Sequence, residues 1–354
     1  MDPNASKKHL LNMLSKEDAL KRLYAEDFKR VTVSFYRYVM IEDPSDLRDV
    51  LFQEWKKLQV FGRIYVAHEG INAQLSVPEH LLEKFTAKVH SRKEFANIPF
   101  KIAIEDDGKS FFKLTIKVRE QIVADGLPIN EYDVTNVGKH LSAEEWNKAM
   151  EEGAVIVDMR NHYESEIGHF EGAICPQSET FKDELPEVKE MLEGKEGEKV
   201  LLYCTGGIRC EKTSAYLKHH GFEDVNQLHG GIIDYARQLE DNKQLTNKFK
   251  GKNFVFDERL AERISTEVIS ACHQCGALSD THVNCKNVNC NLLFIQCEAC
   301  QEAHQRCCTP ECLEVIKLPE EEQKKLRQGI ENKKRFHSHQ KVDLRNAFKD
   351  TDNS

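Results

Sequence analysis

The 354-residue sequence has no long apolar run, no excess of positive charge and no small-residue cleavage site near its start. The missing apolar run argues against a membrane-spanning helix, and the first residues, MDPNASKKHLLNML, do not resemble a secretory signal. We therefore expect a cytoplasmic protein in which cysteines stay reduced. Because the net charge is −9, any contact with nucleic acid must depend on local basic patches.

Familiar cofactor motifs are also missing. No Gly-rich nucleotide-binding pattern indicates flavin or NAD, and no 2-His-1-carboxylate pattern indicates non-haem iron. The chain shows no internal repeats. With 40% hydrophobic and 31% charged residues, it is long enough for two or three globular domains with their own cores.

The most informative stretch that is present is CTGGIR, residues 204–209. An apolar run at 199–203 predicts a buried strand before it, and the pattern at 210–222 predicts a helix after it. The backbone N–H groups of such a turn, with the helix dipole, lower the pKa of a thiol. Cys204 is therefore the predicted nucleophile, and Arg209 adds a fixed positive charge. The loop that would hold the reacting group contains Thr205, Gly206, Gly207 and Ile208.

The length of this loop distinguishes it from a phosphatase loop. Cysteine phosphatases need Cys-x5-Arg to surround a phosphate, whereas Cys204 and Arg209 enclose only four residues, which suits a persulfide sulfur or another small group. Asp158 and Arg160 end a neighbouring predicted strand, at the same edge of the sheet as Cys204. Cys210 either resolves an oxidised Cys204 as a disulfide or packs as a small buried residue.

The chain is predicted to contain three folded regions and a charged tail. Residues 1–125 follow the order β-α-β-β-α-β, which is the ferredoxin-like (acylphosphatase-like) α+β arrangement, with an extra strand in a closing strand pair. Strands alternate with helices in residues 136–245, which predicts a parallel α/β sheet. Residues 246–318 form a cysteine-rich region. Residues 319–354 are predicted to be flexible or to form an exposed helix.

Nine of the twelve cysteines lie between residues 272 and 312. Their CxxC spacings are typical of metal sites, and we expect one or two structural zinc ions. The predicted ligands are Cys272, Cys275, Cys285, Cys290, Cys297, Cys300, Cys307 and Cys312. Spacing does not give the pairing, one cysteine is left over, and His273, His282 and His304 are alternative ligands. An iron–sulfur cluster is the alternative metal group.

Two basic segments are candidates for contact with RNA. Lys113, Lys117 and Arg119 share one strand face beside aromatic residues, which suits phosphate contact and base stacking, although a solvated strand face has the same pattern. The tail carries a second set: Lys324, Lys325, Arg327, Lys333, Lys334 and Arg335. The turn at 68–72, HEGIN, is expected to face either the RNA or the neighbouring domain.

Three motifs resemble the rhodanese domain: DMRNHYESEIGHFEGA at 158–173, YCTGGIRCEK at 203–212 and LHGGI at 228–232. The resemblance implies a rhodanese-like fold for the second domain and a persulfide on Cys204. It also implies that Asp158 and Arg160 brace the loop. On its own, it is equally consistent with a sulfurtransferase that carries sulfur to tRNA or to a thiol acceptor.

Longer motifs are similar to the bacterial TrhO family, of YceA type. They are AHEGINAQLSVP at 67–78, EDDGKSFFKLTIKVRE at 105–120, GKNFVFDER at 251–259 and CHQCG at 272–276. This resemblance implies oxygen-dependent hydroxylation of the wobble uridine of tRNA to 5-hydroxyuridine, with Cys204 in the active site. tRNA would be the partner, dioxygen the co-substrate and the electron donor unidentified, with no DNA or membrane involved. Whether Cys204 acts as a persulfide or adds to the uracil ring stays open.

Overall fold

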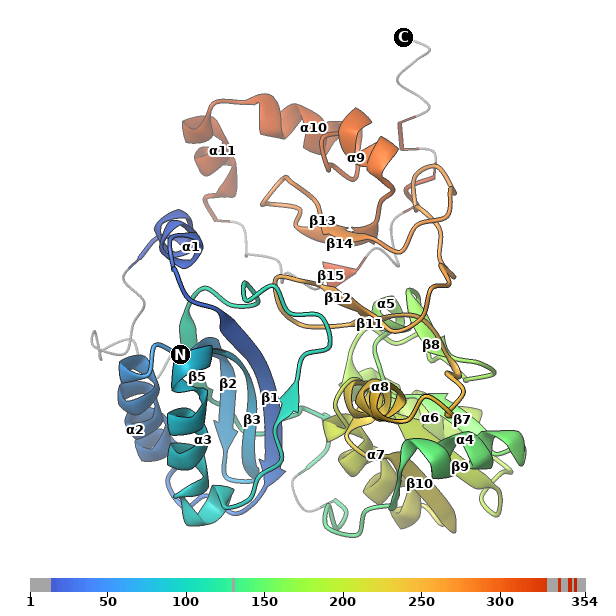
Figure 1. Cartoon of the computed structure of the whole chain (residues 1–354). Helices are drawn as coiled ribbons and strands as arrows, with labels where there is room; N and C mark the ends of the chain where they lie inside the picture. The colour runs from blue at the N-terminus through green and yellow to red at the C-terminus, as the bar shows by residue number, and fades with distance from the viewer. Residues whose placement is uncertain (1–13, 129–130, 330–336, 339–342, 346, 349–354) are drawn as a thin grey trace.

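The computed structural model describes residues 14–128, 131–329, 337–338, 343–345 and 347–348. Figure 1 shows an N-terminal sheet with helices on its outer side, an α/β domain next to its inner side, and a cysteine-rich region above both. No helix among the described residues is long and apolar enough to cross a membrane.

The first domain is a five-stranded sheet in the order β4-β1-β3-β2-β5. Its strands are β1 (Arg30–Tyr38), β2 (Phe61–Ala67), β3 (Gly70–Pro78), β4 (Lys101–Ile102) and β5 (Leu114–Val118). Its helices are α1 (Lys16–Tyr24), α2 (Pro44–Lys57), η2 (Glu79–Leu81), α3 (Leu82–His90) and η3 (Lys93–Phe95). Because side chains alternate along a strand, Val33 and Phe35 of β1 enter the core with Trp55 of α2, while Tyr36 faces the opposite way, towards the second domain.

The closing strand pair predicted for this domain is wrong in one respect. Strands β4 and β5 do not pair with each other, since β4 pairs with β1 at one edge and β5 pairs in parallel with β2 at the other. The chain between them is held to β1, because Asp106 accepts hydrogen bonds from the backbone N–H and hydroxyl of Thr32, at 2.6 and 2.9 Å. This connection crosses the end of the sheet and cannot form a hairpin.

The second domain has the predicted parallel sheet, in the order β6-β10-β9-β7, with helices on both faces. Its strands are β6 (Lys139–Leu141), β7 (Val155–Asp158), β8 (Gly168–Phe170), β9 (Lys199–Tyr203) and β10 (Asp224–Leu228). Its helices are α4 (Ala143–Glu151), α5 (His162–Ser165), α6 (Phe181–Met191), α7 (Ile208–His219) and α8 (Gly231–Asp241). Alternate residues of β9 pack under α6 and α7 on one face and under α4 and α8 on the other. This double burial explains the continuous apolar run KVLLY.

The third region begins with a strand that pairs with a strand of the second domain. Its strands are β11 (Phe249–Phe254), β12 (Ala261–Arg263), β13 (His282–Asn284), β14 (Leu292–Ile295) and β15 (His337–Ser338). Its helices are α9 (Glu298–Ala303), α10 (Pro310–Lys317) and α11 (Glu320–Arg327). Strand β11 pairs with both β8 and β12, so these residues form a sheet shared with the second domain.

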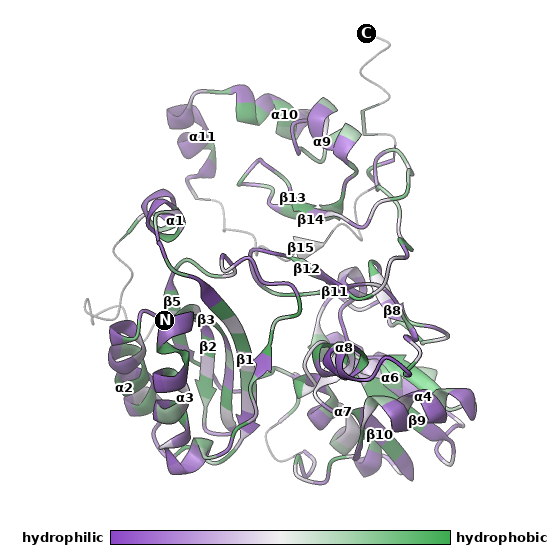
Figure 2. Ribbon diagram, in the orientation of Figure 1, coloured by the Kyte–Doolittle hydropathy of each residue, from purple (hydrophilic) through white to green (hydrophobic). Residues whose placement is uncertain are grey.

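The charged tail contains one exposed helix and, after it, residues that pack on the cysteine-rich region. Helix α11 buries no residue, and Figure 2 shows it almost entirely hydrophilic. The backbone of β15 then pairs with β14, and Leu344 is buried in the cluster around Phe294. Of the basic tail residues, Lys324, Lys325 and Arg327 lie on α11, whereas Lys333, Lys334 and Arg335 lie outside the described residues.

Candidate active site between the first two domains

The CTGGIR loop lies at the carboxyl end of β9 and at the start of α7, as the sequence predicts. Gly207 caps α7 with a φ of 94°, a left-handed conformation that favours glycine. Its backbone N–H donates a 3.1 Å hydrogen bond to the sulfur of Cys204. The thiol therefore lies at the positive end of a helix dipole, which stabilises a thiolate.

A second glycine pair, in the LHGGI motif, forms the other side of this loop. The backbone N–H groups of Ile232 and Ile233 donate to the carbonyl oxygens of Cys204 and Thr205, at 3.0 and 3.2 Å. A Cβ atom on Gly231, which has a φ of 70°, would lie 2.5 Å from the carbonyl oxygen of Cys204. Glycine is thus required here because the start of α8 touches the loop.

The electrostatics of the loop favour an ionised Cys204. Complete burial by itself would raise the pKa of this thiol. A hydrogen bond with the Cys210 thiol, the charge of Arg209 and the backbone N–H groups of both residues outweigh burial and lower the pKa to about 5. Cys210, in contrast, has its pKa raised well above the ordinary value, chiefly by burial. Of this buried pair, Cys204 is the thiolate and Cys210 the hydrogen-bond donor.

Arg209 is held by a carboxylate that sequence reasoning missed. Its two terminal nitrogens donate to both oxygens of Glu164, at 2.7 and 2.9 Å, and both side chains are buried. Glu164 lies on α5, inside a motif quoted for the rhodanese resemblance, but nothing in its spacing marks it as a partner. Because Glu164 binds both terminal nitrogens, Arg209 acts on Cys204 as a fixed charge. Glu184 of α6 is also fully buried, and burial raises the pKa of its carboxyl well above the usual range.

Asp158 and Arg160 lie behind the loop. Both are fully buried, and Arg160 donates to both carboxylate oxygens of Asp158, at 2.8 and 2.6 Å, and to the carbonyl of Gly168. The hydroxyl of Tyr203, which directly precedes Cys204, donates to Asp158 at 2.8 Å. The pair therefore contacts the end of β9 and does not line the cavity described next.

A cavity of about 350 Å³ lies between the Cys204 loop and the inner face of the first domain's sheet. The loop contributes Cys204, Thr205, Gly206, Ile208 and Arg209. Strands β1 to β4 contribute alternating side chains, among them Ser34, Tyr36, Arg63, Tyr65, Asn72, Gln74 and Lys101. Figure 1 shows why this face is available, because α2 and α3 lie on the other side of the sheet. The first two domains therefore form two walls of the cavity.

Three residues of the first domain reach the CTGGIR loop or the start of α7. The hydroxyl of Tyr36 donates to Glu211 at 3.0 Å, and that of Tyr38 donates to the carbonyl of Ile208 at 3.3 Å. The side chain of Lys101 lies beside Gly206, and its ammonium lies 4.6 Å from the centre of the Tyr36 ring. Sequence reasoning missed all three, since more than a hundred residues separate them from the loop.

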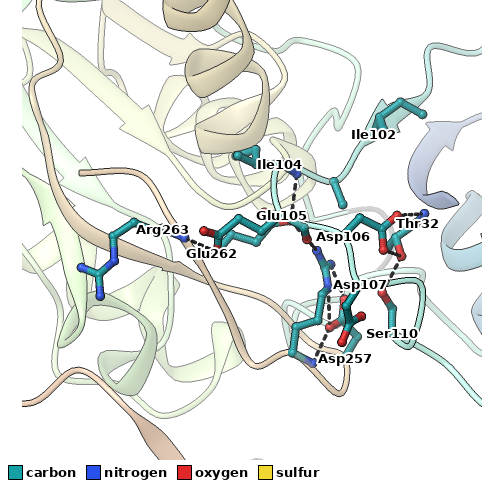
Figure 3. Close-up of polar contacts among 12 residues, drawn as sticks. Thr32, Ile102, Ile104, Glu105, Asp106, Asp107, Ser110, Asp257, Glu262 and Arg263 are labelled. Atoms are coloured by element: carbon teal, nitrogen blue, oxygen red, sulfur yellow. Dashed lines mark hydrogen bonds and ion pairs between the residues drawn. The ribbon is translucent and has the colours of Figure 1, made fainter. Parts of the chain in front are cut away.

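The third wall of the cavity forms where two of the family motifs, EDDGKSFF at 105–112 and FDER at 256–259, meet. Arg259 donates to the carbonyl of Glu105 and to the carboxylate of Asp257, each at 2.5 Å. The backbone N–H of Ile104 donates to Glu262 at 3.0 Å. Figure 3 shows the acidic side chains of both segments gathered at this junction. The EDDGKSFF and FDER motifs therefore close the cavity by binding each other.

The predicted basic face lies on β5 and the residues that flank it, at the edge of the same sheet. Lys113, Lys117 and Arg119 are exposed, and Lys117 pairs in register with Tyr65, which lines the cavity. The guanidinium of Arg119 lies 5.6 Å from the centre of the Tyr65 ring. These three cations thus continue the cavity-lining face outward to solvent.

The cysteine-rich region brings eight sulfurs together in two groups of four. The first group is Cys272, Cys275, Cys297 and Cys300, and the second is Cys285, Cys290, Cys308 and Cys312. Within each group the sulfurs lie within 4.8 Å of one another. The prediction of Cys307 is wrong, because Cys308 takes its place while Cys307 is buried in the neighbouring apolar cluster. No histidine among the described residues belongs to either group.

Comparison with known proteins agrees with this organisation. Residues 30–122 match the UPF0176 acylphosphatase like domain, residues 142–238 the Rhodanese-like domain and residues 250–313 the Rhodanase C-terminal domain. The tRNA uridine(34) hydroxylase of Leptospira interrogans is 59% identical over 337 residues, which cover 95% of this chain and 92% of that one.

The chain belongs to the tRNA uridine(34) hydroxylase family. A second member, from Cronobacter sakazakii, is 50% identical over 91% of this chain and 93% of its own. These alignments extend well beyond the rhodanese-like segment, so all three folded regions are shared with the tRNA uridine(34) hydroxylases.

Proposed function

We propose that this chain hydroxylates uridine 34 of tRNA, with Cys204 as the nucleophile. The observation that carries the proposal is an ionised thiol, with a pKa of about 5, facing a cavity that the first domain closes. Two relatives named tRNA uridine(34) hydroxylase align with this chain over nearly their whole length. The family therefore supports the proposed reaction, and the ionised thiol supports Cys204 as the nucleophile.

The size and depth of the cavity suit one unstacked nucleotide. Cys204 has no exposed surface of its own, so a base must leave its stack to reach the sulfur. The volume of about 350 Å³ is at the small end of the range for small-molecule sites. We assign Lys113, Lys117 and Arg119 to the adjoining RNA backbone, because they extend the same face. In this arrangement the anticodon loop lies across β5.

Two routes for the sulfur follow from the same site. In one route the Cys204 thiolate adds to C6 of the uracil ring and makes C5 electron-rich. In the other route, dioxygen first oxidises the Cys204 sulfur, or a persulfide on it, to a peroxy form, and that form delivers the oxygen atom. Dioxygen is the co-substrate in either route, and the electron donor is not identified. We place the reaction in the cytoplasm, where the tRNA substrate is found.

We also propose that each four-cysteine group holds one zinc ion. A tetrahedral site with Zn–S bonds of about 2.3 Å needs sulfurs about 3.8 Å apart. The sulfurs of Cys275 and Cys297 are 3.6 Å apart, and that of Cys308 lies 3.5 Å from Cys290 and 3.7 Å from Cys312. Four thiolates and no open position favour a structural ion, which supplies folding energy. An iron–sulfur cluster is the alternative occupant.

Nucleoside mass spectrometry of tRNA tests the reaction and the residue together. A strain lacking this chain is complemented with the wild type, with Cys204→Ala or with Cys175→Ala, whose thiol lies outside the loop. We expect wobble 5-hydroxyuridine and its derivatives to disappear in the deletion strain and to return with all but Cys204→Ala. Recovery with Cys204→Ala would remove the nucleophile from the proposal.

The same experiment separates the second candidate function. The match to the Rhodanese-like domain at residues 142–238 favours a sulfurtransferase that works through a persulfide on Cys204. In that case the hydroxylated nucleosides would persist in the deletion strain, and a thiolated nucleoside would fall instead.

A further inference from the structure

Lys101 stands apart from the other cations that line the cavity. Four cationic residues line it, namely Arg63, Lys101, Arg209 and Arg259. Arg209 is bound to Glu164 and Arg259 to Asp257, while Arg63 donates to the carbonyl of Phe256 at 3.3 Å. In the described part of the chain, no hydrogen bond or ion pair engages the ammonium of Lys101.

The position of this ammonium has an energetic cost. Lys101 is half-buried on β4, and its alkyl chain lies beside Gly206 while its ammonium lies over the Tyr36 ring. Burial lowers the pKa of Lys101, which Asp234, Cys204 and Glu211 only partly oppose. A cation withdrawn from water without a bound anion is unfavourable, and this position suits a substrate atom on which negative charge develops.

We propose that Lys101 is a catalytic residue of this site, and that its ammonium holds the uracil O4 oxygen while negative charge develops there. The proposal rests on the proposed function. The Cys204 thiolate attacks C6, a C6–S bond forms, and the electron pair of the C5=C6 double bond moves to give an enolate with its charge on O4. Lys101 donates a hydrogen bond to that oxygen. A preorganised donor of this kind stabilises the transition state more than the ground state.

The addition step has a readout that needs neither oxygen nor an electron donor. When the enolate takes a proton from water at C5, the adduct carries two hydrogens there. Loss of the original hydrogen and departure of the thiolate then restore uracil. The net change is exchange of the C5 hydrogen with water, with no oxidation. A tRNA carrying 5-deuterouridine at position 34 therefore loses deuterium under anoxic conditions if this step occurs.

The test compares Lys101→Gln with Lys84→Gln, which changes an exposed lysine on α3 at the opposite face of the sheet. We expect Lys101→Gln to lower both deuterium loss and the kcat of hydroxylation by about 100- to 1,000-fold, which is the usual cost of removing one oxyanion donor. The KM for tRNA should stay within about threefold, and Lys101→Arg should recover part of the rate. Lys84→Gln should behave as the wild type, and circular dichroism verifies that each variant is folded.

Several outcomes would overturn this role. Unchanged rates in Lys101→Gln, or a raised KM at constant kcat, would make Lys101 a spectator or a phosphate contact. The pKa of Cys204 should rise somewhat in Lys101→Gln, because the two charges attract each other. If that rise, measured from the pH profile of alkylation, accounted for the whole loss of rate at the assay pH, Lys101 would be a stabiliser of the thiolate instead. Hydroxylation by the wild type without deuterium loss would exclude the addition and leave the proposed function intact. Absence of hydroxylation in the wild type would instead overturn the proposed function itself.

Discussion

The ionisation of Cys204 depends on a few atoms in its immediate surroundings. Burial opposes the thiolate, and the groups that overcome it lie within six residues along the chain: Cys210, Arg209 and the loop N–H groups. Asp158, Arg160 and Tyr203 hold the end of β9 from behind and do not touch the sulfur. The pKa of Cys204 is therefore set locally, and single substitutions near it should change it.

Cys210→Ala should raise the pKa of Cys204, because the Cys210 thiol makes the largest single contribution that lowers it. In the wild type, the folded-state pKa of about 5 lies far below the ordinary value of 9.0. Alkylation of Cys204 should therefore be nearly constant above about pH 6 and slow down as the pH falls through 5. In Cys210→Ala the fall should begin at higher pH. Peptide mass spectrometry after iodoacetamide treatment reports the rate for Cys204 alone.

Cys175→Ala is the matched control, since this half-buried thiol is not among the main groups that set the pKa of Cys204. Its alkylation profile at Cys204 should coincide with that of the wild type. If Cys210→Ala also gave the wild-type profile, the thiol–thiol hydrogen bond would not be a cause of the low pKa.

Prediction from sequence succeeded at this scale where the signal is local. Cys204, its glycines and Arg209 form one continuous motif, so strand, turn and helix patterns were sufficient to predict the local structure around Cys204. Glu164, Tyr36 and Lys101 were missed because their contacts with the loop depend on how distant segments pack. A glutamate in a short helix and a tyrosine in a strand have the same local pattern whether or not they reach an active site.

At the scale of single elements, the cysteine-rich region shows how a shift of one residue decides which cysteine joins a four-sulfur group. Cys307 and Cys308 are neighbours in the sequence, yet only the sulfur of Cys308 joins Cys285, Cys290 and Cys312. Thr309 begins α10 by accepting a hydrogen bond from the backbone N–H of Cys312. This cap fixes Cys312 on the first turn of α10. Cysteine spacing predicted the region, but the direction of each side chain depends on the fold.

Cys308→Ala and Cys307→Ala should therefore differ in metal content. We expect two metal ions per chain in the wild type and in Cys307→Ala, and about one in Cys308→Ala, because three thiolates hold a structural ion poorly. Inductively coupled plasma mass spectrometry measures the number of ions and identifies the metal. Iron with acid-labile sulfide in place of zinc would replace the zinc assignment, and equal metal content in the two variants would contradict the grouping.

At the scale of the whole molecule, the cavity exists only because the first domain is fixed against α7. Lys212 of α7 is buried and forms ion pairs with Glu69, at 3.0 Å, and Asp125, at 3.1 Å. Glu69 belongs to the HEGIN turn, so this turn faces the neighbouring domain, one of the two alternatives that its sequence left open. Tyr36 adds a second link through Glu211. These contacts hold Lys101 and the aromatic side chains over the loop.

Lys212→Met should uncouple the two domains and destabilise the protein. The substitution leaves two carboxylates of the junction without their cation, and breaking a buried ion pair in this way costs about 3–5 kcal/mol. We expect a lower free energy of unfolding, faster hydrogen exchange around β1 and β4, and a loss of hydroxylation. Lys189→Met, at an exposed position on α6 of the same domain, should leave all three unchanged. Full hydroxylation by Lys212→Met would mean that the loop works without the first domain held above it, and the two-domain site would have to be abandoned.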